Sequence, residues 1–210
     1  LILEEVLNEN RKKLAELKLN VIIELLNELG RKLIFDPTIN TLPGITYLSL
    51  WLKRDNLQRI CRLNFLDGSY YEEFKPTLSN YELRTQPRGI VCHWVAGNIP
   101  TLTLFSLIQA ILSKNGSVVK IPEHNKDLIL AFLRLLSETT VEVDNQVYSG
   151  SNIVRAIAVI AFDWREDELN KGFSMIADCR IVWGGATAVK AIMALPQKEH
   201  CDTIVFGPKY

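Results

Sequence analysis

The second half of the chain alternates short apolar runs with segments of helical spacing, and this alternation limits the fold more than any other feature. Strands are predicted over residues 89–95, 117–121, 154–162, 179–182 and 203–206, and helices over residues 101–112, 126–137, 166–171 and 187–194. The strands are nearly continuous in apolar residues, which is typical of parallel strands covered on both faces. We therefore expect an α/β fold, a Rossmann-like parallel sheet with helices on both faces.

Residues 1–86 follow a different pattern from residues 87–210. Apolar residues recur at three- and four-residue steps through the first thirty positions and predict a helix, with Gly30 expected at its C-cap. A second helical stretch is predicted over residues 47–64, and the polar residues 69–88 are expected to be a connection. The sequence thus predicts a helical N-terminal region, residues 1–86, before the α/β domain. A final strand that runs into a Gly-Pro turn leaves a sheet edge unfinished, so we expect part of a longer protein.

Composition argues against several classes of partner. Lysine and arginine together number 24, as do aspartate and glutamate, which removes the electrostatic case for nucleic acid or an anionic membrane. No apolar run is long enough to span a bilayer. The four cysteines show no CxxC pair, so neither a disulfide framework nor a metal site is expected, and a reducing cytoplasm is the simplest location.

Three loops that follow predicted strands contain polar or glycine residues, at the edge where open parallel sheets bind ligands. Asn98 can donate its amide to a developing oxyanion, or it can be an ordinary helix N-cap. Lys120 and Glu123 can reach a ribose or a phosphate, or they can form a solvated ion pair. Gly184 and Gly185 let the backbone approach a pyrophosphate at a helix N-terminus, although the GxGxxG fingerprint is absent.

These loops occur in an order found in one known superfamily. The segments GIVCHWVAGNIP (residues 89–100) and NGSVVKIPE (residues 115–123) resemble the aldehyde dehydrogenases, in which successive strands end in PWNFP and in a KPxE-type segment. WGGATAV (residues 183–189) resembles their FTGS loop at the nucleotide diphosphate, and FGPK (residues 206–209) stands in place of ELGGK. The variant forms are most similar to the LuxC-type acyl-CoA reductases. The resemblance covers residues 87–210 and implies an NAD(P)-binding domain of aldehyde-dehydrogenase type.

The resemblance also implies roles for individual residues. It places Asn98 in the oxyanion hole, where its amide donates to the thioester or aldehyde oxygen. It assigns the cofactor site to Lys120 and Glu123 at the adenosine ribose, with Pro122 between them, and to Gly184, Gly185, Ala186 and Thr187 at the diphosphate. The general-base glutamate of many aldehyde dehydrogenases falls near Val205, which cannot take a proton, and this favours a reductase.

Other notable side chains are interpreted as structural. Cys92, Cys179 and Cys201 are expected to be small core residues, and His93 a packed histidine, with contact to the active site as its alternative. Trp94 and Trp183 are expected to be wall or core aromatics.

The implied reaction is the NAD(P)H-dependent reduction of a long-chain fatty acyl-CoA, or another acyl thioester, to the aldehyde. It proceeds through an acyl-enzyme on a cysteine beyond this chain, so the chain alone is expected to bind a dinucleotide and turn nothing over. Lys120 would attract a 2′-phosphate, whereas Glu123 would repel one and prefer free hydroxyls. The resemblance implies NADPH as the cofactor, and Glu123 leaves NADH as an alternative. An aldehyde or semialdehyde dehydrogenase and a non-catalytic nucleotide-binding module stay open, as do a homo-oligomer and acyl-transfer partner proteins.

Overall fold

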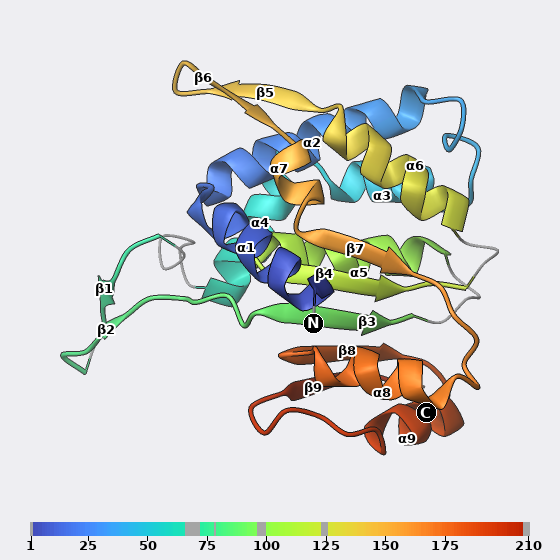
Figure 1. Cartoon of the computed structure of the whole chain (residues 1–210). Coiled ribbons are helices and arrows are strands. Elements are labelled where there is room, and N and C mark those ends of the chain that lie inside the picture. The colour runs from blue at the N-terminus through green and yellow to red at the C-terminus, as the bar shows by residue number, and fades with distance from the viewer. Residues whose placement is uncertain (1, 66–71, 78, 96–99, 123–125, 208–210) are drawn as a thin grey trace.

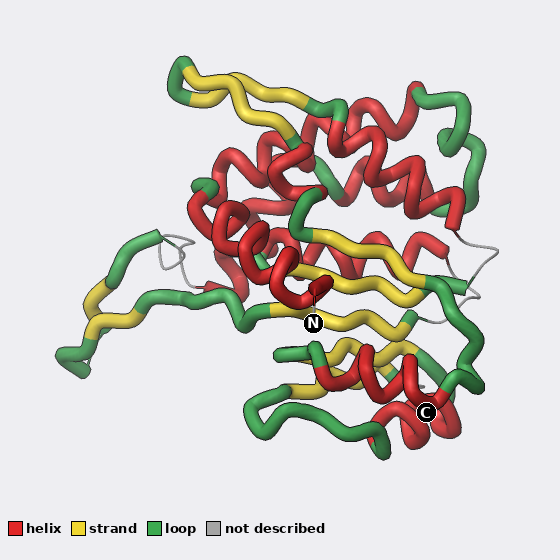
Figure 2. Tube along the Cα trace, viewed as in Figure 1, coloured by secondary structure: helices red, strands yellow, loops and turns green. Residues whose placement is uncertain are grey.

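The computed structural model describes residues 2–65, 72–77, 79–95, 100–122 and 126–207, and its central element is a five-stranded parallel sheet (Figures 1 and 2). The strand order is β7-β4-β3-β8-β9. The sheet strands are β3 (Ile90–Trp94), β4 (Gly116–Lys120), β7 (Ile157–Ile160), β8 (Cys179–Trp183) and β9 (Asp202–Phe206). Two small antiparallel ladders pair β1 (Lys75–Pro76) with β2 (Glu82–Leu83), and β5 (Thr140–Val143) with β6 (Gln146–Ser149).

The helices divide between the two faces of this sheet. They are α1 (Ile2–Glu16), α2 (Leu19–Phe35), α3 (Ile45–Trp51), α4 (Arg54–Phe65), α5 (Pro100–Leu112), α6 (Lys126–Ser137), α7 (Ser151–Val154), α8 (Asp167–Met175) and α9 (Ala186–Met193). From β3 the chain runs outward through β4 to β7, then crosses back to β8 and β9. Because such crossovers are right-handed, α5 and α6 cover one face, and α8 and α9 cover the other (Figure 1). The order reverses between β3 and β8, which is the point where open α/β sheets bind ligands.

One large apolar cluster joins the N-terminal helices to the α5 and α6 face. It includes buried leucines and isoleucines of α2, α3 and α4 together with those of α5 and α6. Helix α2 alone contributes nine buried residues, because apolar positions recur along one stripe of its surface. A second cluster, on the other face, joins Leu7 of α1 to β3, β8 and Phe173 of α8. The boundary predicted at residue 86, between a helical N-terminal region and the α/β domain, stays a prediction.

The α/β fold class predicted from the sequence is confirmed, and most elements lie where they were expected. Helix α6 has the predicted bounds, and β3, β4, β8 and β9 differ from prediction by one or two residues. Helix α5 begins at Pro100, as a proline at the first helical position favours.

Five local features differ from the prediction. The first thirty residues form two helices, separated at Leu17 and Lys18, and the stretch over residues 47–64 is also broken in two, at residues 52–53. Strand β7 is shorter than predicted because residues 151–154 form a helical turn before it. The β5–β6 hairpin was not predicted; its turn places Asp144 and Asn145 at positive φ, which these two residue types tolerate better than most. Finally, Gly30 is not a C-cap but lies inside α2.

Gly30 allows α2 to approach the segment around α3 closely. An added Cβ would lie 2.9 Å from Leu52 Cβ and 3.2 Å from the carbonyl oxygen of Ser49. Alanine normally stabilises a helix interior by about 1 kcal/mol relative to glycine. We expect Gly30→Ala to reverse that sign and lower the free energy of unfolding by about 1–2 kcal/mol, measured by urea denaturation. Gly172→Ala in α8, where an added Cβ meets nothing within 4 Å, is the matched control and should stabilise by about 0.5–1 kcal/mol. Equal effects at the two positions would contradict the close-packing account.

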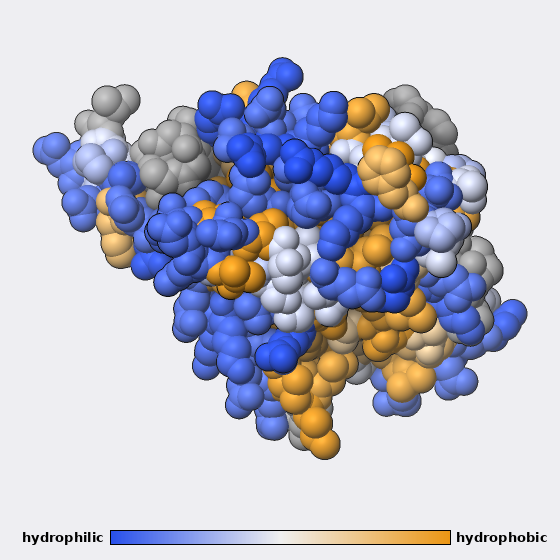
Figure 3. Space-filling model, turned by 90° about the horizontal axis from the view of Figure 1, so that it is seen from above, coloured by the Kyte–Doolittle hydropathy of each residue, from blue (hydrophilic) through white to orange (hydrophobic). Residues whose placement is uncertain are grey.

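The molecular surface over α2 and α6 is mainly hydrophilic, with separate hydrophobic patches (Figure 3). Arg134 of α6, which forms ion pairs with Asp36 and Glu138, is one of the charged side chains at this layer. None of the helices in the described ranges has the length and apolar character that crossing a membrane requires.

Candidate functional site

A cavity of about 930 Å³ lies at the carboxyl ends of β3, β4, β7 and β8, between the loops that leave these strands and helices α8 and α9. Four residues assigned to a cofactor from the sequence line this cavity, namely Lys120, Pro122, Gly184 and Gly185. Ala186 and Thr187 follow directly, as the exposed first two residues of α9. Asn98 and Glu123 lie outside the described residues. The structure therefore brings six of the eight predicted site residues to one edge of the sheet.

The start of α9 has the properties of an anion-binding site. Gly185 is the N-cap residue and has no side chain that could cap the helix, and the first turn contains no acidic residue. The backbone N–H groups of the first turn therefore have no side-chain acceptor from the cap, and no acidic side chain offsets the positive end of the helix dipole. An added Cβ at Gly185 would meet nothing within 4 Å, so there is room for a ligand against the backbone. A phosphate group suits this environment.

Lys120 supplies a positive charge at the end of β4. Its Nζ lies 4.6 Å from the centroid of the Phe162 ring. Burial holds the pKa of Lys120 below its ordinary value, and the nearby carboxylate of Asp163 acts in the opposite direction. An ammonium group that has lost part of its hydration in this way favours an anionic or hydroxyl-rich ligand beside it.

Most of the remaining cavity wall is apolar, apart from Asp163, Asp167 and Asn170. Trp183, at the end of β8, stacks on Phe206 with a 3.9 Å centroid distance, and its Nε1 donates to Ser106 Oγ at 3.4 Å. On the other side, Ala188 and Ala191 present small exposed side chains from α9, which has no fully buried residue. A mostly apolar cavity with a few convergent polar groups is the usual form of a cofactor site.

Comparison with known proteins places the chain in a family. The sequence profile described as Acyl-CoA reductase (LuxC) matches residues 6–210. The chain belongs to the LuxC family. This confirms the resemblance inferred from the loop motifs of residues 87–210 and extends it over the N-terminal helices.

This LuxC-family chain spans less than a third of the length of the curated relatives that it matches. The long-chain acyl-protein thioester reductase of Aliivibrio fischeri is 30% identical over 153 residues, which is 70% of this chain and 29% of that protein. A probable aldehyde dehydrogenase from Listeria monocytogenes has a TM-score of 0.62 at 17% identity, over 98% of this chain and 45% of that chain. The glyceraldehyde-3-phosphate dehydrogenase GapN from Methanocaldococcus jannaschii, solved with NADP, has a TM-score of 0.62 at 10% identity, over 96% and 44%. The structures show the aldehyde dehydrogenase fold.

The cysteines and the strand histidine of this LuxC-family chain are structural. Burial raises the pKa of Cys61 and of Cys179 to about 11, and it also raises the pKa values of Cys92 and Cys201. None of these thiols is a ready thiolate nucleophile. His93 is buried between Ser106 and Ser117, whose hydroxyls lie 2.8 Å from Nδ1 and 3.3 Å from Nε2, and burial lowers its pKa to about 3. Its imidazole is neutral at pH 7 and packs inside the sheet layer.

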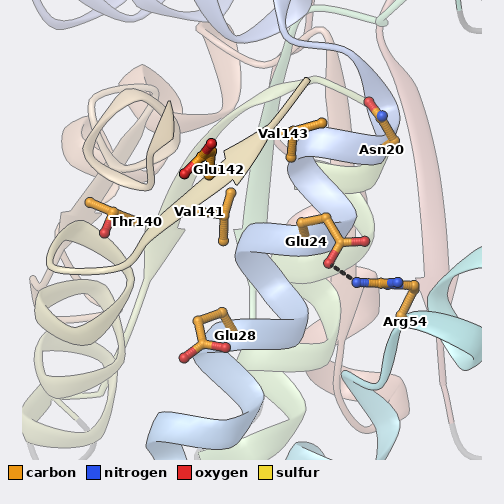
Figure 4. Close-up of a pocket in the computed structure, with 8 residues that line it drawn as sticks. All are labelled: Asn20, Glu24, Glu28, Arg54, Thr140, Val141, Glu142 and Val143. Carbon is orange, nitrogen blue, oxygen red and sulfur yellow. Dashed lines mark hydrogen bonds and ion pairs between the residues drawn. The ribbon is translucent and has the colours of Figure 1, made fainter. Parts of the chain in front are cut away.

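A second hollow, of about 430 Å³, lies between α2 and β5 and does not suit the same ligand. Figure 4 shows Glu24 and Glu28 on α2 beside Val141 and Val143 of β5. Glu24 pairs with Arg54 and Glu28 with Arg31, and the carboxylate of Glu142 adds negative charge to the same groove. This charge would repel a nucleotide diphosphate.

Sequence reasoning missed one wall of the cavity. Residues 161–164, just after β7, line it together with Asp167 and Asn170 of α8. The end of β7 could have indicated this wall, because the loops that follow parallel strands all leave from the same edge of the sheet. The predicted strand ran to residue 162 and so absorbed part of this loop.

Proposed function

We propose that the cavity binds the dinucleotide of an acyl-CoA reductase, an enzyme that converts a long-chain fatty acyl thioester to the aldehyde. The reaction would pass through an acyl-enzyme on a cysteine outside residues 1–210. The observation that carries the proposal is the convergence of the uncapped start of α9 and the ammonium of Lys120 on one mainly apolar cavity. The match to less than a third of a long-chain acyl-protein thioester reductase supports the substrate class.

Each proposed contact uses a property of a particular group. The backbone N–H groups at Gly185, Ala186 and Thr187 would donate to the diphosphate, and Lys120 would hold the adenosine ribose or its 2′-phosphate. A reduced nicotinamide supplies the hydride when it is bound. Asn98 as oxyanion donor and Glu123 as acceptor from ribose hydroxyls stay proposals, since both lie outside the described residues.

NADPH is the cofactor that we propose, with NADH as the alternative. Lys120 is the reason, because a partly buried ammonium gains most from the charge of a 2′-phosphate. Asp163, which pairs with Arg165 at 3.4 Å, is the nearby carboxylate that would moderate this preference. The four free cysteines accord with a reducing compartment such as the cytoplasm.

Two other functions use the same site. An aldehyde or semialdehyde dehydrogenase would bind the same cofactor but would need a base to activate water. Val205, which stands where such a base is expected, cannot provide one, and this favours the reductase. A non-catalytic module would bind the dinucleotide but would not become acylated. An acylation assay on a chain that extends beyond residue 210 therefore distinguishes this module from both enzymes.

Equilibrium dialysis with NADPH and NADH tests the cofactor site. We expect this chain to bind NADPH more tightly than NADH, and Lys120→Met to weaken NADPH binding about tenfold or more while affecting NADH less. Lys190→Met removes an equal charge from the exposed part of α9 and is the matched control, expected to change binding less than twofold. Binding of neither cofactor to the folded chain, or an unaltered Lys120→Met, would show that the ribose assignment is wrong.

A further inference from the structure

Trp94, at the carboxyl end of β3, has an unusual combination of burial and missing hydrogen bonding. Its side chain is 5% exposed, and it lines the cavity. Its Nε1 is the buried side-chain nitrogen for which the described part of the chain offers no acceptor. Trp183, the other tryptophan at this edge of the sheet, donates its N–H to Ser106 instead.

The surroundings of Trp94 explain why its N–H has no partner. The indole packs against Phe173 with a centroid distance of 4.2 Å, in a cluster that includes Leu7, Ile90 and Val118. These side chains are hydrocarbon and accept no hydrogen bond. A buried donor without an acceptor destabilises a fold, and a phenylalanine would fill an apolar wall without that cost. A tryptophan here therefore points to an acceptor that enters from the cavity.

The register of the sheet locates where such an acceptor would be. In the parallel ladders Trp94 pairs with Lys120 of β4 on one side and with Val182 of β8 on the other. Trp94 thus lies between the lysine assigned to the ribose and the strand that leads into Gly184 and Gly185. A ligand that reached both would carry its ribose and phosphate oxygens past the indole.

We propose that the indole N–H of Trp94 donates a hydrogen bond to an oxygen of the ribose–diphosphate stretch of the bound dinucleotide. This inference rests on the proposed cofactor site and adds a donor that the motifs did not indicate. Trp94 is then a cofactor-binding residue that lines the cavity and packs on Phe173.

Indole N–H resonances in ¹H–¹⁵N spectra of the whole chain test this directly. The sequence contains four tryptophans, and single Trp→Phe variants assign their resonances. On saturation with NADP⁺ we expect the Trp94 resonance to move strongly, and that of Trp51, which packs on Phe105 away from the cavity, to stay in place. ADP should reproduce the shift of Trp94, and adenine should not. A Trp94 resonance that does not move, or one that moves equally with adenine, overturns the assignment.

Affinity provides a second measurement. We expect Trp94→Phe to weaken NADP⁺ binding about tenfold in equilibrium dialysis, against less than twofold for the control Trp51→Phe. If Trp94→Phe fails to fold, the response of the Trp94 indole resonance in the wild-type chain still tests the proposed hydrogen bond. Wild-type binding with an unmoved Trp94 resonance would refute this inference alone, whereas no binding of NADP⁺ to the folded wild-type chain would refute the proposed cofactor site and the inference with it.

Discussion

Gly185→Asp should abolish most nucleotide binding while making the chain slightly more stable. Gly185 has φ −69° and ψ 165°, a conformation that an L-residue adopts without strain, and an added Cβ meets nothing within 4 Å. Aspartate is a favoured N-cap and complements the helix dipole, so we expect the free energy of unfolding to rise by about 0.5–1 kcal/mol. The same carboxylate would occupy the place of a phosphate and repel the diphosphate, which should weaken NADPH binding roughly hundredfold.

The opposite signs of these two effects make the variant informative. Gly185→Asn is the matched control, because asparagine caps the helix about as well without a charge. We expect the asparagine variant to retain most of the affinity that the aspartate variant loses. Dialysis and urea denaturation on the same preparations measure both quantities. Full NADPH affinity in the aspartate variant would mean that the diphosphate does not lie at the start of α9.

Arg180→Met is expected to cause the largest loss of stability, about 3–4 kcal/mol. Arg180 lies on β8, is 1% exposed, and has neutral acceptors around its guanidinium. It donates to Thr203 Oγ1 at 2.9 Å, to Ser174 Oγ at 3.1 Å and to Gln197 Oε1. It also donates to the carbonyl oxygens of Ile192 and Leu195, at 3.2 Å and 3.5 Å. Methionine fills similar volume but removes all five of these hydrogen bonds, including the one to the fully buried Ser174 Oγ.

This arginine also connects the sheet to the cofactor site. Ile192 lies in the last turn of α9, whose first turn is the proposed diphosphate site. Urea denaturation measures the stability change, and Arg165→Met, on the exposed loop after β7, is the control that should stay within about 0.5 kcal/mol of the wild type. A loss of less than about 1 kcal/mol for Arg180→Met would show that the network around α9 does not fix its position.

Much of the fold follows from local patterns in the sequence. Strands β3, β4 and β8 are short apolar runs between turn residues, and α6 carries leucines at helical spacing after Pro122, so each could be located without knowledge of the rest. Gly30 could not be interpreted locally, because its role depends on Leu52, a residue on another segment. The adjacency of β8 to β3 likewise depends on long-range packing and not on the residues of either strand alone.

The candidate site was predictable where a family motif marked it, and hidden where long-range contacts create it. Lys120, Gly184 and Gly185 were found from their loops and line one cavity. Asp163 was missed, because its effect on Lys120 arises only when the end of β7 lies beside the end of β4. The unpartnered nitrogen of Trp94 is also a property of the packed structure, since sequence shows a tryptophan but not what surrounds it.

The proposed dinucleotide site lies at the carboxyl ends of β3, β4, β7 and β8. Backbone ¹H–¹⁵N shift mapping of the chain during titration with NADPH tests it most directly. We expect the largest changes at residues 184–188, at Lys120 and Ile121 and at residues 161–163, with little change at Glu24, Glu28 and Glu142. Changes concentrated in the α2–β5 groove, or none at saturating NADPH, would contradict it.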